Sequence, residues 1–176
     1  MKTHSSRRSF IKKTGAAALG FAIVPRHVLG QGMTPPSDQI NIAVIGGGGK
    51  GYSDAVNVWN NHASNIAAIC DVDWNMADDA FKKFPKAKKY KDWRKVLDDM
   101  GDIDALTIST PDHTHAVIAH VAMQMGKDVY VQKPLTHNIY EARVLTEAAT
   151  KNKIVTQMGN QGASGAGIKQ MIKWFN

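Results

Sequence analysis

The length, charge and cysteine content of this chain already exclude several classes of protein. Its 176 residues suffice for one well-filled core. The net charge of +7 is concentrated in residues 1–30, which hold six of the 22 Lys and Arg and no acid, leaving 16 basic and 15 acidic residues. The charge is therefore poor evidence for a nucleic-acid partner, and we expect none. The single cysteine, Cys70, excludes an intrachain disulfide and fits a small buried hydrophobe.

Residues 1–30 have the order of an export signal: a basic region, a short apolar stretch and then small or polar residues. Residues 6–12 read S-R-R-S-F-I-K, which resembles the twin-arginine signal S-R-R-x-F-L-K with Ile11 in the Leu position. The apolar stretch 15–24 is shorter than the ~20 residues that a spanning helix needs. We predict a signal peptide, the twin-arginine export machinery as partner, a periplasmic or extracellular location and no permanent membrane span. A membrane-bound basic arm, or a signal left uncleaved as an anchor, stays open.

Residues 31–39 contain Gly32, Pro35 and Pro36 and are predicted to be a linker. Beyond them, apolar runs alternate with helical patterns, which is typical of an α/β domain over residues 40–176. We expect a Rossmann doubly wound parallel sheet with helices on both faces. The predicted strands are 41–45, 66–70, 88–90, 105–109, 128–132 and 153–157. The predicted helices are 52–61, 74–83, 92–100, 114–125, 138–151 and one from about 165 to the end.

A glycine-rich turn follows the first of these strands. Gly46, Gly48 and Gly51 fit the pattern G-x-G-x-x-G, and Gly49 lies in the same turn. The three glycines suit a tight turn, close approach of the backbone to a pyrophosphate and close packing of helix on strand. A helix beginning there offers free N–H groups and a positive dipole end to phosphates. The pattern predicts a dinucleotide site; the alternative is a turn that only packs a helix on the sheet.

Asp71 ends the second predicted strand, about twenty residues after the glycines. A carboxylate there can accept hydrogen bonds from the ribose hydroxyls and repel a 2′-phosphate, so we expect NAD rather than NADP. Asp73 adds negative charge nearby. Lys50 is the opposing signal, unless it contacts pyrophosphate or solvent.

Two further motifs follow strands. Residues 110–115 read T-P-D-H-T-H after the strand at 105–109, and residues 132–134 read Q-K-P after the strand at 128–132. Together with the glycine turn, they resemble the Gfo/Idh/MocA oxidoreductase family, with its T-P-x-x-x-H and E-K-P motifs. The resemblance covers about residues 40–175 and implies an NAD(P)-binding domain followed by a second, mixed-sheet domain. That domain is absent here, so we expect a fragment or a truncated product.

The resemblance also implies roles for individual residues. It places Thr110, Pro111, His115, Gln132 and Lys133 beside the cofactor, with Lys133 and His115 as candidate catalytic residues. Lys133 would assist proton transfer at the reacting carbinol. Gln132 departs from the motif because it replaces the usual Glu. Loss of that carboxylate favours the neutral form of Lys133, or else weakens the positioning of the cofactor.

Several other polar features receive a structural interpretation. Two histidines at positions 113 and 115 do not face each other on a helix, and no metal site is expected. The lysine-rich, aromatic run 81–95 is flanked by acids and is predicted to be a solvated face. Asp112 suits a helix cap or a cofactor contact equally. Asn160 and Gln161 could orient a sugar or the nicotinamide amide, or lie in a plain polar loop.

These features predict a sugar or cyclitol oxidoreductase with a retained NAD cofactor and a small-molecule sugar substrate. One alternative is an NAD-dependent glycoside hydrolase or lyase that acts through transient sugar oxidation. The other is a nucleotide-binding module without catalysis. The full-length protein could also form a homo-oligomer.

Overall fold

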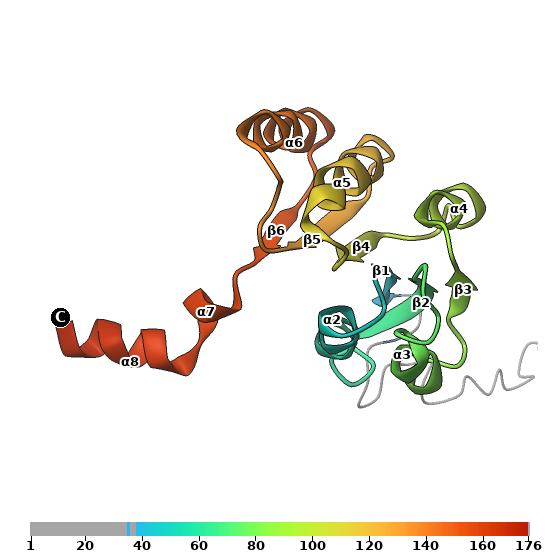
Figure 1. Cartoon of the computed structure of the whole chain (residues 1–176), viewed down its shortest axis with the longest axis horizontal. Coiled ribbons are helices and arrows are strands. Elements are labelled where there is room, and N and C mark those ends of the chain that lie inside the picture. Colours follow the sequence, from blue (N-terminus) through green and yellow to red (C-terminus); the bar gives the residue numbers. More distant parts are fainter. Residues whose placement is uncertain (1–34, 36–37, 176) are drawn as a thin grey trace, which may run out of the picture. The chain divides into compact units, whose positions relative to one another are not determined.

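Figure 1 shows the computed structural model, in which residues 35 and 38–175 are described. The chain divides into two units, residues 1–37 and 38–176. The predicted signal peptide and most of the predicted linker fall outside the described residues. The structural description concerns the second unit.

The second unit is built on one six-stranded sheet with the order β3-β2-β1-β4-β5-β6. Every neighbouring pair in it is parallel. This is the strand order of a doubly wound dinucleotide-binding sheet, so the predicted fold class is confirmed. The strands are β1 (Ile40–Ile45), β2 (Ser64–Cys70), β3 (Lys88–Tyr90), β4 (Ala105–Ile108), β5 (Asp128–Gln132) and β6 (Thr156–Gly159).

Helices cover both faces of the sheet (Figure 1). Helices α2 and α3 pack on one face, while α4, α5 and α6 pack on the other. The helical segments are α2 (Lys50–Trp59), α3 (Asp78–Lys83), α4 (Trp93–Asp99), the 3₁₀ turn η2 (Asp112–Thr114), α5 (His115–Gln124), α6 (Ile139–Asn152), α7 (Gln161–Ser164) and α8 (Ala166–Phe175). In the described part of the chain, no helix combines the length and apolar character needed to cross a bilayer.

Alternate residues of the central strand β1 belong to two separate cores. Ala43 and Ile45 pack with α4, α5 and α6, whereas Ile42 and Val44 pack with α2 and α3. Successive side chains of a strand point to opposite faces. Because both faces of β1 are buried, its sequence is a continuous apolar run rather than an alternating pattern.

The predicted boundaries are wrong by a few residues where local backbone geometry decides them. Helix α2 ends at Trp59 because residues 60–62 all have positive φ. Residues 74–77 form a turn, so α3 begins only at Asp78. Strand β6 lies at Thr156–Gly159, about three residues beyond its predicted start. Asn138 and Glu141 form a capping box that fixes the start of α6.

The buried face of α5 offers a test of how far packing supports this fold. Ile118 is 1% exposed in the core, whereas Ile139, also on a helix, is 75% exposed. We expect Ile118→Ala to lower the free energy of unfolding by about 2–5 kcal/mol and Ile139→Ala by less than about 0.5 kcal/mol. Urea unfolding followed by circular dichroism measures both. Equal losses would contradict the assigned core.

Candidate nucleotide site

The carboxyl ends of the strands bring the predicted site residues to one edge of the sheet. Ile45 is paired with Cys70 of β2 and with Ile108 of β4, and the register continues from Ile108 to Val131 of β5. The residues that follow these strand ends therefore emerge side by side. In sheets of this kind ligands bind beyond that edge.

The glycine turn leaves no room for side chains at the three glycines of the G-x-G-x-x-G pattern. Gly46 has a φ of +86°, and a Cβ there would lie 2.7 Å from the Ser109 carbonyl oxygen. A Cβ on Gly48 would lie 2.8 Å from the Met76 carbonyl oxygen, and one on Gly51 would overlap the Gly46 carbonyl oxygen. The Gly51 contact is the close approach of helix to strand that the motif predicts. Gly49 has a φ of +50° with open space around it and precedes α2.

Asp71 is tied to the glycine turn. Its Oδ2 accepts hydrogen bonds from the backbone N–H groups of Gly47 (2.9 Å) and Gly48 (3.1 Å), and its Oδ1 accepts one from Asp73 N–H (3.0 Å). A carboxylate offers about four acceptor positions. Asp71 therefore organises the turn and still has capacity for a further donor on the cleft side.

A cleft of about 640 Å³ opens beside these residues. Its volume lies within the usual range for small-molecule and cofactor sites. Gly46, Gly48, Asp71, Thr110 and Pro111 line it. The glycine turn, the acid after β2 and the Thr-Pro segment after β4 thus converge on one cavity, as the sequence predicts.

The cleft also has walls that the sequence analysis did not assign. Lys91, Trp93 and Arg94 line it from the segment after β3. Asp92 accepts a hydrogen bond from the Arg94 N–H (3.0 Å), which lowers the pKa of the Asp92 carboxyl, with further help from the Arg94 guanidinium. The available signal was the strand at 88–90, whose carboxyl end must reach the same edge of the sheet.

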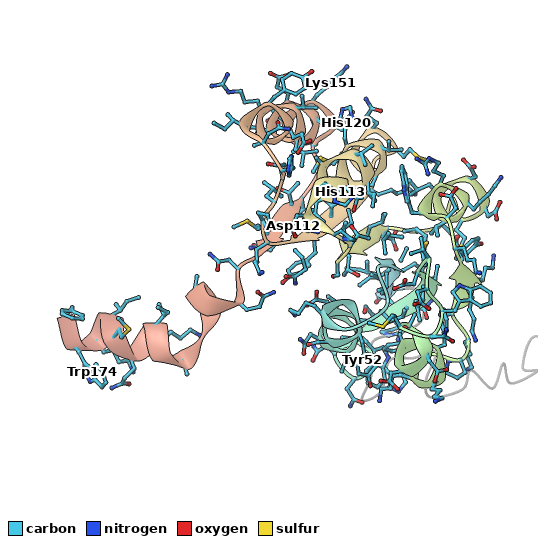
Figure 2. All side chains as sticks on the ribbon, in the orientation of Figure 1. Tyr52, Asp112, His113, His120, Lys151 and Trp174 are labelled. Atoms are coloured by element: carbon cyan, nitrogen blue, oxygen red, sulfur yellow. The ribbon has the colours of Figure 1, made fainter. Side chains whose placement is uncertain are left out.

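The Thr-Pro segment is braced by the turn that follows it. The hydroxyls of Thr110 and Thr114 lie 2.7 Å apart, and the Thr114 hydroxyl also lies 2.7 Å from the Pro111 carbonyl oxygen. Asp112 is in the first turn of η2, but its side chain makes no capping hydrogen bond there, so of its two predicted roles the helix cap is not observed. Asp112 and His113 both lie near the start of α5 (Figure 2) and are exposed.

His115 is buried, with 1% of its surface exposed. Its Nδ1 lies 2.7 Å from the Pro134 carbonyl oxygen and its Nε2 lies 2.8 Å from the Thr110 carbonyl oxygen. Both partners are acceptors, so a cationic ring can donate to both and a neutral ring to one. The ring joins the Thr-Pro segment to the Lys-Pro segment. Its catalytic assignment stays a prediction.

The Lys-Pro segment combines a buried glutamine with an exposed lysine. Gln132 is 5% exposed, and its Nε2 donates to Asp54 Oδ2 (2.7 Å). Lys133 is exposed, and within the described residues its Nζ has neither a hydrogen bond nor an ion pair. Lys50 at the start of α2 pairs with Asp54 as well. The neutral residue before Lys133 therefore faces a buried anion.

Cys70 behaves as its apolar strand predicts. Burial raises the pKa of its thiol to about 12, and the nearby carboxylates of Asp71 and Asp92 add to the shift. A thiol with so high a pKa is a poor nucleophile at neutral pH. Among the described residues, no group of three or more His, Cys, Asp or Glu could hold a metal ion.

The residues after β6 lie at the same edge. Met158 and Gly159 belong to the strand itself rather than to the loop after it. Asn160 precedes α7, and the Gln161 Nε2 donates to Gln132 Oε1 (2.8 Å). Gln161 thus orients another residue of the site.

Comparison with known proteins defines the class of protein. The model of the Gfo/Idh/MocA oxidoreductase family, described as having an NAD-binding Rossmann fold, matches residues 40–160. The chain belongs to this family, and NAD is the cofactor of its Rossmann domain.

Individual relatives extend the comparison. Levoglucosan dehydrogenase of Pseudarthrobacter phenanthrenivorans is 32% identical over 66% of this chain and 32% of its own length. An alpha-N-acetylgalactosaminidase of Shewanella oneidensis is 25% identical over 95% of this chain and 42% of its own length. The chain thus spans about a third to two fifths of these curated relatives.

Solved structures share the fold. An oxidoreductase of unassigned activity from Klebsiella pneumoniae is 26% identical, with a TM-score of 0.66 over 78% of this chain and 40% of that one. The WlbA dehydrogenase from Bordetella pertussis, solved in complex with NADH and UDP-GlcNAcA, is 20% identical, with a TM-score of 0.65 over 74% of this chain and 38% of its own. The latter likeness concerns the fold alone.

The residues present fit a dinucleotide. A Cβ at Gly46, Gly48 or Gly51 would collide with the backbone of Ser109, Met76 or Gly46, and the glycine turn leads directly into the N-terminus of α2. Asp71 supplies a carboxylate at the cleft. Lys91 and Arg94 also line the cleft, but Lys91 lies over the Trp74 ring and Arg94 pairs with Asp92. This arrangement favours a ribose hydroxyl over a 2′-phosphate.

Asp71 can be tested against its neighbour. We expect Asp71→Asn to weaken NAD binding about tenfold or more, because hydrogen bonds to a charged acceptor contribute about 1.5–3 kcal/mol. The preference for NAD over NADP should fall as well, because the repulsive charge is gone. Isothermal titration calorimetry with both nucleotides measures this. Asp73→Asn is the matched control, and an equal loss in both variants would contradict the assigned role of Asp71.

Proposed function

We propose that the full-length protein is an NAD-dependent oxidoreductase that acts on a carbinol carbon of a sugar or cyclitol. The observation that carries the proposal is the convergence of the glycine turn, Asp71 and the Thr-Pro segment on one cleft at the carboxyl edge of the sheet. The names of the relatives, a levoglucosan dehydrogenase among them, support a sugar as the substrate. Bound NAD would accept a hydride from the carbinol carbon.

In this proposal Lys133 assists removal of the hydroxyl proton. Its side chain is exposed, and no partner among the described residues holds its Nζ, so it is available to a substrate hydroxyl. The backbone around it is fixed on both sides: Gln132 is bound to Asp54, and the Pro134 carbonyl oxygen faces His115. His115 then acts by holding this segment, because both ring nitrogens face backbone carbonyls.

A second candidate function has a specific observation in its favour. The alpha-N-acetylgalactosaminidase of Shewanella oneidensis matches 95% of this chain, more than the dehydrogenase does. For this chain such a function would mean that the sugar is oxidised transiently at bound NAD, a glycosidic bond breaks, and the hydride returns to the sugar. Such an enzyme would release no net NADH.

The leader supports a proposal about location. Its resemblance to a twin-arginine signal favours export in the folded state, to the periplasm or beyond. Because soluble NAD is expected to be scarce there, we propose that the cofactor is loaded before export and travels with the protein.

The activity is tested with the full-length protein and its Lys133→Gln variant. We expect sugar-dependent formation of NADH, with kcat lowered about 10²–10⁴-fold in the variant and NAD affinity changed less than about threefold. NADH absorbance and product analysis measure the two outcomes. Glycosidic cleavage without net NADH would favour the hydrolase. If the 176-residue chain binds NAD and the full-length protein turns over no sugar, the chain is a binding module.

Export is tested by replacing both arginines of the leader. We expect Arg7→Lys together with Arg8→Lys to keep the protein in the cytoplasm, because the export machinery reads the arginine pair. Fractionation followed by immunoblotting measures this, and Lys2→Arg is the control. Carefully desalted protein from the exported fraction should still release NAD on denaturation. Exported protein without nucleotide would overturn the loading proposal.

A further inference from the structure

A buried hydrogen-bonded network centred on Asp54 connects the segments that form the site. Asp54 lies on α2, one turn after Lys50, and is 3% exposed. Its Oδ1 is paired with Lys50 Nζ, while its Oδ2 accepts from Ser109 Oγ (2.8 Å) and Gln132 Nε2 (2.7 Å). A buried carboxylate is tolerated only when donors surround it, and Asp54 has three.

Gln132 is fixed at both ends of its amide. Its Nε2 donates to Asp54, and its Oε1 accepts from Gln161 Nε2 (2.8 Å). A glutamate in the same place could accept from Gln161, but it could not donate to Asp54 while both acids are ionised. Gly159 packs beside this side chain, and only glycine fits there, since a Cβ would lie 2.7 Å from Gln132 Nε2. The glutamine has little freedom to turn away.

We propose that Asp54 and Gln132 are a matched anion–amide pair that positions the Lys133 segment against the helix of the glycine turn. The buried carboxylate is supplied by Asp54 of α2. The residue before Lys133 must donate a hydrogen bond to it, and a neutral glutamine can do so. This accounts for the glutamine at a place where the E-K-P motif has an acid. Asp54 and Gln132 are positioning residues, and they act through Lys133 and through the start of α2.

The coupling runs through two short connections. Gln132 immediately precedes Lys133, so a shift of its side chain moves the backbone of the lysine. Asp54 lies one helical turn after the start of α2. A displacement of Asp54 therefore also displaces the backbone N–H groups at the N-terminus of this helix, next to the glycine turn. An acid at position 132 would place two carboxylates within hydrogen-bond distance in a buried site. Two ionised carboxylates this close repel each other, so either one of them takes up a proton or the end of β5 moves away from α2, and both responses cost free energy.

The test is a double-mutant cycle on the 176-residue chain: Gln132→Glu, Asp54→Asn and both together. We expect Gln132→Glu to lower Tm by about 10 °C or more and to weaken NAD binding about tenfold. In the double variant the anion and the amide exchange places, so Tm should return to within about 3 °C and NAD affinity to within about threefold of the parent. Differential scanning fluorimetry and calorimetric titration with NAD measure both.

Gln157→Glu on the neighbouring strand β6 is the matched control. It adds the same charge at an exposed position and should change NAD affinity less than about twofold. The proposal is overturned if Gln132→Glu changes Tm and NAD affinity as little as this control does. It is also overturned if the double variant has a Tm and an NAD affinity no higher than those of the weaker single variant. If Gln132→Glu fails to fold, a folded double variant supports the pairing and an unfolded one overturns it. Because neither readout needs turnover, failure here is distinct from failure of the proposed function.

Discussion

The site depends on one close approach, that of Gly51 at the start of α2 to the Gly46 carbonyl oxygen. No side chain fits between them. This contact brings the first turn of α2 down onto the ends of β1 and β4, where Gly46 also lies against Ser109. Once the helix is this close, its side chains one turn later can reach the neighbouring strands. The lack of a side chain at Gly51 thus sets the distance between α2 and the strand ends, on which the other contacts of the site depend.

Two carboxylates then hold the glycine turn and the segments around it. Asp71 accepts from the N–H groups of Gly47 and Gly48, and Asp54 accepts from Ser109 and Gln132 while pairing with Lys50. The first is partly open to the cleft, and the second is buried. Only the first can serve a ligand directly. The second, Asp54, contacts only protein groups. Its charge therefore acts by fixing the positions of Ser109, Gln132 and Lys50.

Sequence reasoning succeeded where local chemistry decides the structure. The apolar strands, the glycine turn and Asp71 each leave a pattern within a few residues, and parallel strands force their carboxyl ends to one edge. It did not place Trp93 and Arg94 in the cleft, although it predicted the strand at 88–90, because no motif marks the segment that follows this short strand. It could not pair Asp54 with Gln132, 78 residues away, since neither residue has a local signal for the other.

His115 belongs to the predicted site, but its contacts are those of a structural residue. A histidine near a reacting centre suggests acid–base work, yet this ring is buried with both nitrogens beside backbone carbonyls. Proton exchange with a substrate would first require the ring to leave one of these partners. Lys133 lies between the Gln132 and Pro134 anchors, with an exposed amine on a fixed backbone. Under the proposed function, the buried polar groups around Gln132 and His115 give rigid support, and the exposed Lys133 amine is the group that meets the substrate.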